Sequence, residues 1–266
     1  MQSKWRCNPW LKRIIVLGSC TAVGAFLYWR FYYDKTYPRP AFTLQTGAVG
    51  SLSAAAISPD GALLLTTRRF SRNDCILVWQ TVTWEQIGTL NGPSERITCV
   101  KFSRKGDLLG CSSKDGTVRL WDARTWEEIT TLHHDNPVLG IDFSPDGHTL
   151  AAAVAYDNDC QLKVPERVGV DLWDLNNNAK SIRLPLEVEP ASGVVFSNDG
   201  EYVAIGCIDG TVVIWDVTKE KKRLTLKGHG SEVLSVAFSP DGKMRSWWPS
   251  RVACVSPVAT AHSLAE

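Results

Sequence analysis

A repeated turn motif constrains the fold of this 266-residue chain more than any other feature of its sequence. Five strand-like runs each end in a turn that begins with serine and closes with glycine, at 55–61, 100–106, 141–147, 194–200 and 236–242. The successive serines lie 45, 41, 53 and 42 residues apart. Self-similarity at such a period is typical of folds that stack one structural unit after another.

A second motif follows each of the first four turns. It is an apolar run that carries a tryptophan near its end, and these tryptophans are Trp79, Trp121, Trp173 and Trp215. One short apolar run lies between the two motifs and another follows the second, so each unit holds four short strands. A single four-stranded sheet cannot bury both of its faces. Successive sheets are therefore expected to pack face to face around an axis.

The Trp-Asp dipeptides, the recurring spacing and the pair Gly228-His229 resemble the WD-repeat family of β-propellers. The resemblance covers about residues 41–242. It implies an all-β fold, a β-propeller of four-stranded antiparallel blades, with about four full blades and the start of a fifth.

In the WD-repeat family a tryptophan, a turn aspartate, the histidine of a Gly-His pair and a hydroxyl residue form a structural hydrogen-bond network. The resemblance assigns this role to the four tryptophans and to Asp115, Asp209 and His229. Only Gly228-His229 matches the Gly-His pair, and the unit that follows it loses the repeat pattern, so the complete network is in question in every blade. His133-His134 occupies a loop in which the family places its Gly-His pair, which favours a structural role there.

The N-terminal part has the pattern of a membrane span. Residues 14–29 hold no charge, and the apolar stretch reaches 33 if Arg30 extends toward the headgroups. Residues 1–40 carry seven basic residues against Asp34, a net charge of +6. The sequence predicts a basic cytoplasmic N-terminus at 1–13, a transmembrane helix or signal anchor at 14–33, a stalk at 34–40 and a propeller on the non-cytoplasmic side. A cleaved signal peptide, a lipoprotein signal at Cys20 and a buried core helix remain open as alternatives.

The repeat pattern stops after Gly242, and 243–266 are expected to form an irregular tail. Three explanations stay open: a truncated or frameshifted form of a longer protein, completion of the ring by another chain, and a small closed ring of four to five blades. Self-association that completes the ring is one expectation that follows.

The composition and motifs favour a binding protein over an enzyme. Residues 41–266 carry a net charge of −5, which argues against nucleic acid as a partner. The chain holds no nucleophile elbow, phosphate-binding loop or metalloprotease motif. Its eight cysteines show no zinc-site spacing, and a disulfide between Cys75 and Cys160 has only weak support. No cofactor and no metal are expected.

The sequence therefore predicts a non-catalytic scaffold that mediates protein-protein interaction at a membrane. A propeller module of an exported enzyme and a non-functional fragment of a longer WD-repeat protein are the alternatives. If partners bind the loops between the second and third strands and those between blades, the candidate contact residues follow from their positions. They are Ser94, Glu95, Lys114, Asn136 and Ile208.

Overall fold

The computed structural model describes residues 52–68, 74–155, 169–177, 179–184, 191–238 and 252–255. The predicted membrane segment, the stalk and most of the tail lie outside these residues. The described part contains strands and turns and no helix. It accordingly holds no helix long and apolar enough to cross a membrane.

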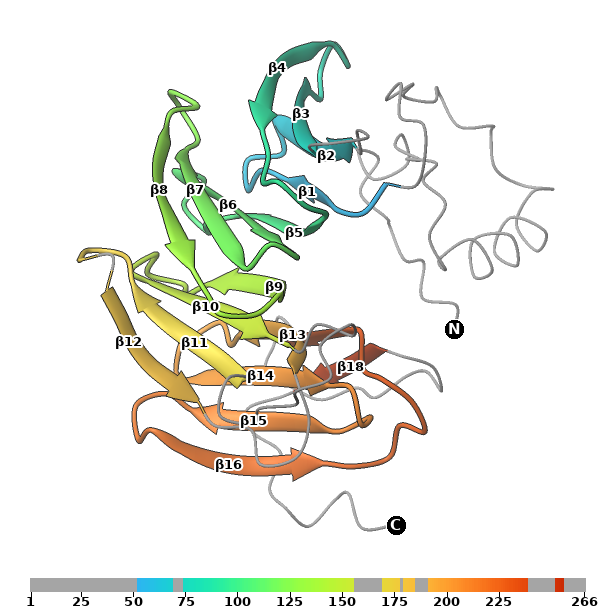
Figure 1. Cartoon of the computed structure of the whole chain (residues 1–266), viewed down its shortest axis with the longest axis vertical. Helices are drawn as coiled ribbons and strands as arrows, with labels where there is room; N and C mark the ends of the chain where they lie inside the picture. The colour runs from blue at the N-terminus through green and yellow to red at the C-terminus, as the bar shows by residue number, and fades with distance from the viewer. Residues whose placement is uncertain are drawn as a thin grey trace, which may run out of the picture.

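Four antiparallel four-stranded sheets, which we call blades 1 to 4, follow one another along the chain. Figure 1 shows them side by side, with the first strand of each blade on the inside and the fourth on the outside. Blade 1 comprises β1 (Ala55–Ile57), β2 (Leu63–Arg68), β3 (Cys75–Gln80) and β4 (Gln86–Asn91). Blade 2 comprises β5 (Ile97–Phe102), β6 (Leu108–Ser113), β7 (Thr117–Asp122) and β8 (Glu128–His133).

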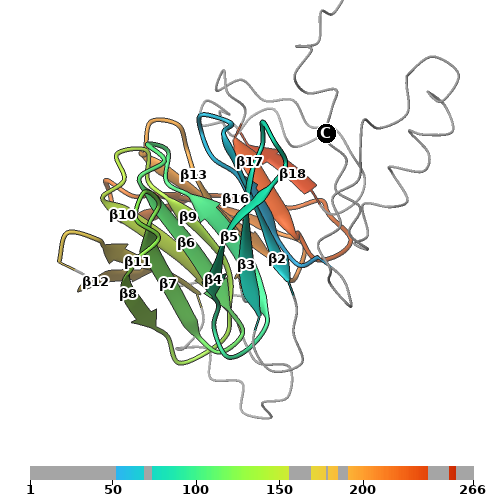
Figure 2. The same cartoon turned by 90° about the horizontal axis from the view of Figure 1, so that it is seen from above.

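Blades 3 and 4 repeat this arrangement. Blade 3 comprises β9 (Val138–Phe143), β10 (Thr149–Val154), β11 (Gly169–Asp174) and β12 (Ala179–Leu184). Blade 4 comprises β13 (Ala191–Phe196), β14 (Tyr202–Cys207), β15 (Val212–Asp216) and β16 (Lys221–Leu226). Seen from above, the successive sheets stack face to face (Figure 2). The expectation of four-stranded antiparallel blades is confirmed.

The chain departs from this pattern after blade 4. Strand β17 (Ser235–Phe238) lies against β13 and β14, at the position of the first strand of a fifth blade. It pairs in parallel with β18 (Val252–Val255). A short piece of the tail thus pairs with the last repeat motif.

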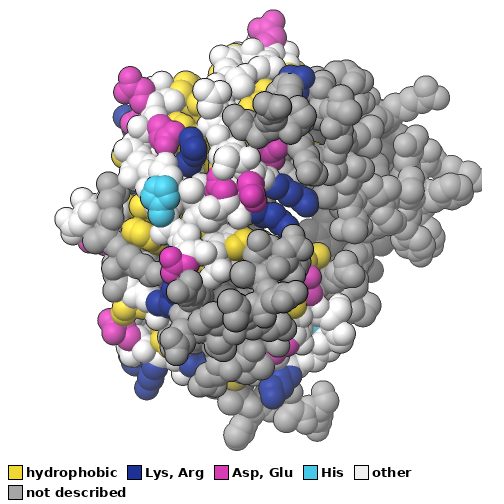
Figure 3. Space-filling view, viewed as in Figure 1, with side chains coloured by type: hydrophobic (Ala, Val, Ile, Leu, Met, Phe, Trp, Pro, Cys, Tyr) yellow, Lys and Arg dark blue, Asp and Glu magenta, His cyan; other side chains and the backbone are white. Residues whose placement is uncertain are grey.

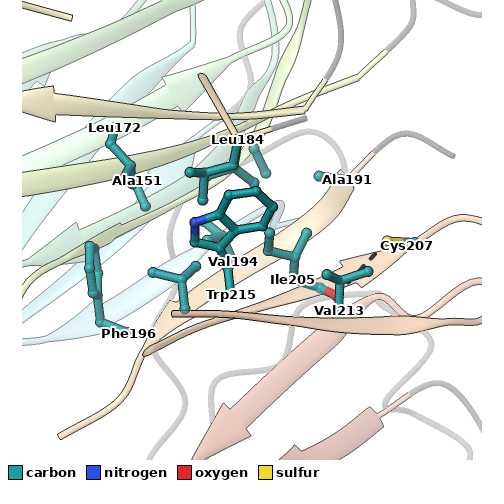
Figure 4. Close-up of a cluster of buried hydrophobic side chains, with 13 residues drawn as sticks. Ala151, Leu172, Leu184, Ala191, Val194, Phe196, Ile205, Cys207, Val213 and Trp215 are labelled. Atoms are coloured by element: carbon teal, nitrogen blue, oxygen red, sulfur yellow. Dashed lines mark hydrogen bonds between the residues drawn. The ribbon is translucent and has the colours of Figure 1, made fainter. Parts of the chain in front are cut away.

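Blades are held together by apolar clusters between neighbouring sheets. Between blades 3 and 4, Leu172, Val194, Ile205 and Trp215 pack into one cluster of 13 buried residues (Figure 4). Strand β14 is buried along its whole length, and its alternating residues belong to the clusters on its two faces. Both faces of a blade are therefore apolar, which is why no blade is stable by itself.

Polar contacts link the innermost strands of successive blades. The Lys101 ammonium of β5 lies 2.7 Å from an Asp142 carboxylate oxygen in β9. The other Asp142 oxygen accepts a hydrogen bond of 2.8 Å from the backbone N–H of Phe196 in β13. The Thr98 hydroxyl donates to the Val138 carbonyl at 2.6 Å. Asp142 thus joins three blades near the axis.

The repeated serines organise the turns between the first and second strands. The hydroxyls of Ser58, Ser103, Ser144 and Ser197 each accept a hydrogen bond from the backbone N–H five residues on, at 2.9 to 3.0 Å. A glycine with positive φ closes each turn, for example Gly106 at +76°. This is the local geometry that the recurring turn motif predicts.

Two tryptophans adopt a backbone conformation that a bulky side chain rarely takes. Trp84 and Trp126 occupy the same position in the turns between the third and fourth strands of blades 1 and 2, with φ of 62° and 64°. Both indoles pack against buried clusters. The backbone strain is offset by this packing, since a left-handed residue costs roughly 1–2 kcal/mol.

We predict that Trp126→Gly is more stable than Trp126→Ala by about 1 kcal/mol, because both variants lose the indole and only glycine relieves the left-handed strain. Both should be less stable than the parent chain. Urea denaturation of the three proteins measures the difference. Equal stability of the two variants would contradict the conformation described for this turn.

Candidate functional site

The connections of each blade fall into two groups at opposite ends of the stack. Because the strands are antiparallel, the turns between second and third strands lie at the same end as the connections between blades. We call this end the loop face. Its described parts include 92–96, 114–116, 134–137, 208–211 and 227–232.

Ser94 and Asp115 meet on the loop face across the boundary between blades 1 and 2. The backbone N–H and hydroxyl of Ser94 donate to one Asp115 oxygen at 2.9 and 3.0 Å. The other oxygen accepts from the N–H and hydroxyl of Thr117 at 3.0 and 2.6 Å. Burial acts to raise the pKa of Asp115, but the hydrogen bonds from Thr117 and Ser94 outweigh it and hold the pKa below its ordinary value. The ionised Asp115 side chain therefore holds the connection between blades 1 and 2 in place through Ser94.

The other candidate contact residues also lie on the loop face. Glu95 and Lys114 are exposed, and the Lys114 N–H donates to the Arg96 carbonyl at 3.0 Å. Asn136 is half-buried beside Gly116. Ile208 is 38 % exposed in the turn between β14 and β15. Glu95, Lys114 and Ile208 thus present side chains to solvent. Ser94 is also exposed, but its hydroxyl is bonded to Asp115.

The structural tryptophans differ in their partners. Trp79 donates from its Nε1 to the Thr66 hydroxyl at 2.8 Å, in the interior of blade 1. Trp173 donates instead to Nε2 of His134, at 3.0 Å. Since an indole N–H can only donate, Nε2 of His134 accepts, and its Nδ1 carries the proton toward the Gly116 carbonyl 3.2 Å away. His134 is therefore neutral and holds the structural position of the family's histidine for blade 3.

Blade 4 lacks this hydrogen bond. The Nε1 of Trp215 is buried and has no partner in the described part of the chain. The resemblance assigns His229 to the structural hydrogen-bond network of this blade. Within the described part of the chain, the His229 side chain makes no hydrogen bond, although the His229 carbonyl lies close to Gly210. The turn aspartate of this blade, Asp209, accepts hydrogen bonds from the N–H and hydroxyl of Thr211 at 2.8 and 2.7 Å.

The fourth structural tryptophan, Trp121 in blade 2, is 3 % exposed within the apolar cluster that faces blade 1.

A buried ion pair lies beside His134. The Asp171 carboxylate of β11 is fully buried and binds Nε and Nη2 of Arg183 in β12 at 2.6 and 2.9 Å. Its Oδ2 lies 3.8 Å from Nε2 of His134. The hydrogen bonds that Arg183 donates to the Asp171 carboxylate raise the pKa of Arg183. The sequence did not predict this pair. Its one signal is a charged residue, Asp171, at a strand position that holds Leu77 in blade 1, Arg119 in blade 2 and Val213 in blade 4.

The described residues offer little to catalysis. They contain no group of three His, Cys, Asp or Glu residues placed to hold a metal ion. Burial raises the pKa of the Cys99 and Cys111 thiols, which keeps both protonated and unreactive at neutral pH. Cys75 is a free, buried thiol, so the disulfide considered with Cys160 is absent and that interpretation is wrong. Cys160 itself lies outside the described residues.

Comparison with known proteins identifies the repeats. The family profile described as "WD domain, G-beta repeat" matches residues 84–122, 126–164, 188–216 and 220–261, which is more than half of the chain. Periodic tryptophan protein 2 of Arabidopsis thaliana is 25% identical over 226 residues, 84% of this chain and 23% of that protein. Pre-mRNA-splicing factor cwf17 of Schizosaccharomyces pombe is 32% identical over 163 residues, 60% of this chain and 44% of that protein.

Among solved structures, the β-propeller domain of Cps50 (Swd1) from Myceliophteria thermophila is similar, with a TM-score of 0.62 and 20% sequence identity. The similarity covers 73% of this chain and 59% of that one, and it shows the propeller fold. This chain spans less than two thirds of the length of the curated relatives and of this structure.

We predict that Thr66→Val destabilises the chain by about 1–3 kcal/mol, because it leaves the buried Trp79 N–H without an acceptor while keeping the shape of the side chain. Trp79→Phe removes the donor. In a double-mutant cycle measured by urea denaturation, the combined variant should cost less than the sum of the two single variants. Strict additivity would show that the hydrogen bond contributes nothing.

We predict that Arg183→Met costs about 3 kcal/mol and more than Asp171→Leu, because it leaves a fully buried carboxylate without its cation. Asp171→Leu leaves Arg183, which is 23 % exposed and can turn toward water. The double variant should regain part of the loss. Thermal unfolding of the three variants gives the order, and a larger loss in Asp171→Leu would contradict this account.

Proposed function

The chain belongs to the WD-repeat family of β-propellers, and from that premise we propose that it is a non-catalytic scaffold that binds protein partners through its loop face, at a membrane. The observation that carries this proposal is the contrast between the two parts of each blade. The sheets are buried on both faces, while the loop face offers charged and apolar side chains to solvent. One relative is named a transcriptional corepressor and another a pre-mRNA-splicing factor, and these names support protein as the partner.

The membrane part of the proposal rests on the sequence of residues 14–33, which lie outside the described residues. Residues 14–29 carry no charge, and the apolar stretch reaches 33 if Arg30 extends toward the headgroups, a length that suffices to span a bilayer. The basic residues before this stretch favour a cytoplasmic N-terminus. A short stalk would then hold the propeller close to the non-cytoplasmic surface. Anchoring would confine the scaffold and its partners to the same surface.

We predict that Lys114→Glu lowers the recovery of partner proteins co-purified with the full chain, because it reverses an exposed charge on the loop face. Lys105→Glu is the matched control, since Lys105 is also exposed but lies in the turn at the opposite end of the same blade. Quantitative mass spectrometry of crosslinked complexes compares the two. Equal recovery from both variants would remove the loop face as the binding surface.

We predict that the chain stays in the membrane fraction after alkaline carbonate extraction and that deletion of residues 1–33 releases it, because the apolar segment supplies the anchor. Protease added to sealed vesicles or cells then reports on which side the propeller lies. Release of the full-length chain by carbonate would contradict the anchor. Persistence of the deletion variant in membranes would show that another part of the chain binds them.

A further inference from the structure

The outermost strand of blade 4 differs in charge from the other outer strands. The stretch from Lys219 to Lys227 contains β16 and carries five basic residues against Glu220. By contrast, β4 holds no charged residue and β8 holds only Glu128. Strand β12 holds Lys180 and Arg183, and Arg183 is paired with Asp171. Figure 3 shows dark-blue side chains along the lower edge of the molecule, where β16 runs in Figure 1. Strand β16 thus holds more basic residues than any other outer strand in the described part of the chain.

Most of this charge is not neutralised within the fold. Asp216 pairs with Lys219 at 2.9 Å, and that hydrogen bond with the one from Thr218 lowers the pKa of Asp216 to about 2. Lys221, Arg223 and Lys227 are exposed, and within the described part no acidic side chain forms a salt bridge with them. Like charges side by side repel one another, so an anionic partner would be attracted to this strand.

The strand also has features that suit an extended ligand. The guanidinium of Arg223 lies over the ring of Tyr202, 4.6 Å from its centroid, which limits the conformations of the arginine before any partner binds. Strand β16 is the last strand of its sheet, so one row of its backbone N–H and C=O groups is not used by the sheet. Six residues of strand span about 20 Å, a length that a short peptide segment can follow.

We propose that the basic stripe, defined as Lys221, Arg223 and Lys227 on and beside β16, is a second binding surface that holds an extended acidic segment of a protein partner. Protein is favoured over the other polyanions by two observations. Residues 41–266 have a net charge of −5, which opposes the long positive field that nucleic acid requires. The sequence also places the propeller on the non-cytoplasmic side, away from the anionic cytoplasmic leaflet, and this step rests on the proposed function.

The test is fluorescence anisotropy of a labelled peptide of about twelve residues that alternates glutamate and serine, titrated with the full chain in detergent at about 0.1 M salt. The variant Lys221→Gln/Arg223→Gln should weaken binding about tenfold, the combined effect of two exposed ion pairs. Lys105→Gln/Arg124→Gln removes the same charge from exposed turns of blade 2 and is the matched control. Its binding should stay within about twofold of the parent chain.

Three results would overturn the proposal. The first is equal weakening in the two double variants, and the second is tighter binding of a single-stranded oligonucleotide or of phosphatidylserine vesicles than of the peptide. The third is that the parent chain binds no peptide and the Lys221→Gln/Arg223→Gln variant aggregates. The basic side chains would then serve only to keep the exposed edge of the sheet from pairing with another chain. Lys114→Glu should leave peptide binding unchanged, which separates this surface from the loop face.

Discussion

Every blade of this protein has two apolar faces, and the rest of the structure depends on covering both of them. A sheet such as blade 4 cannot be stable in water alone, so each blade requires a neighbour. Apolar packing has little directional preference. The polar contacts near the axis therefore set the orientation of one sheet relative to the next. Asp142 binds Lys101 of the preceding blade and the Phe196 backbone of the following one. These contacts fix how one sheet is rotated on the next and so hold the loop face in place.

Local chemistry made much of this fold predictable. The turn serines bind the chain five residues on, and glycine supplies the positive φ that closes each turn. Both interactions occur within one hairpin, so they are encoded in contiguous residues and repeat with the motif. The four tryptophans follow the same rule, because each occupies the same position in the third strand of its blade. A structural feature formed by residues close together in the sequence can therefore be predicted from a short motif.

Features that join distant residues were not predictable in this way. Trp79 uses Thr66 and Trp173 uses His134, although the two tryptophans stand in the same motif. Trp79 finds its acceptor in the neighbouring strand of its own blade, whereas the acceptor of Trp173 comes from the connection between blades 2 and 3. The Asp171–Arg183 pair joins two strands, and its buried carboxylate lies beside His134 from the connection between blades 2 and 3. Trp84 and Trp126 occupy left-handed positions that sequence preference assigns to glycine, and tertiary packing overrides that preference.

The central claim is that a rigid stack of blades presents one end, the loop face, to protein partners. Hydrogen–deuterium exchange of the full chain, alone and with a purified partner fraction, tests it most directly. The account predicts new protection at 92–96, 114–116, 134–137 and 208–211 and unchanged exchange in the turns at the opposite end. Protection confined to the opposite turns, such as 59–62 and 104–107, would contradict it.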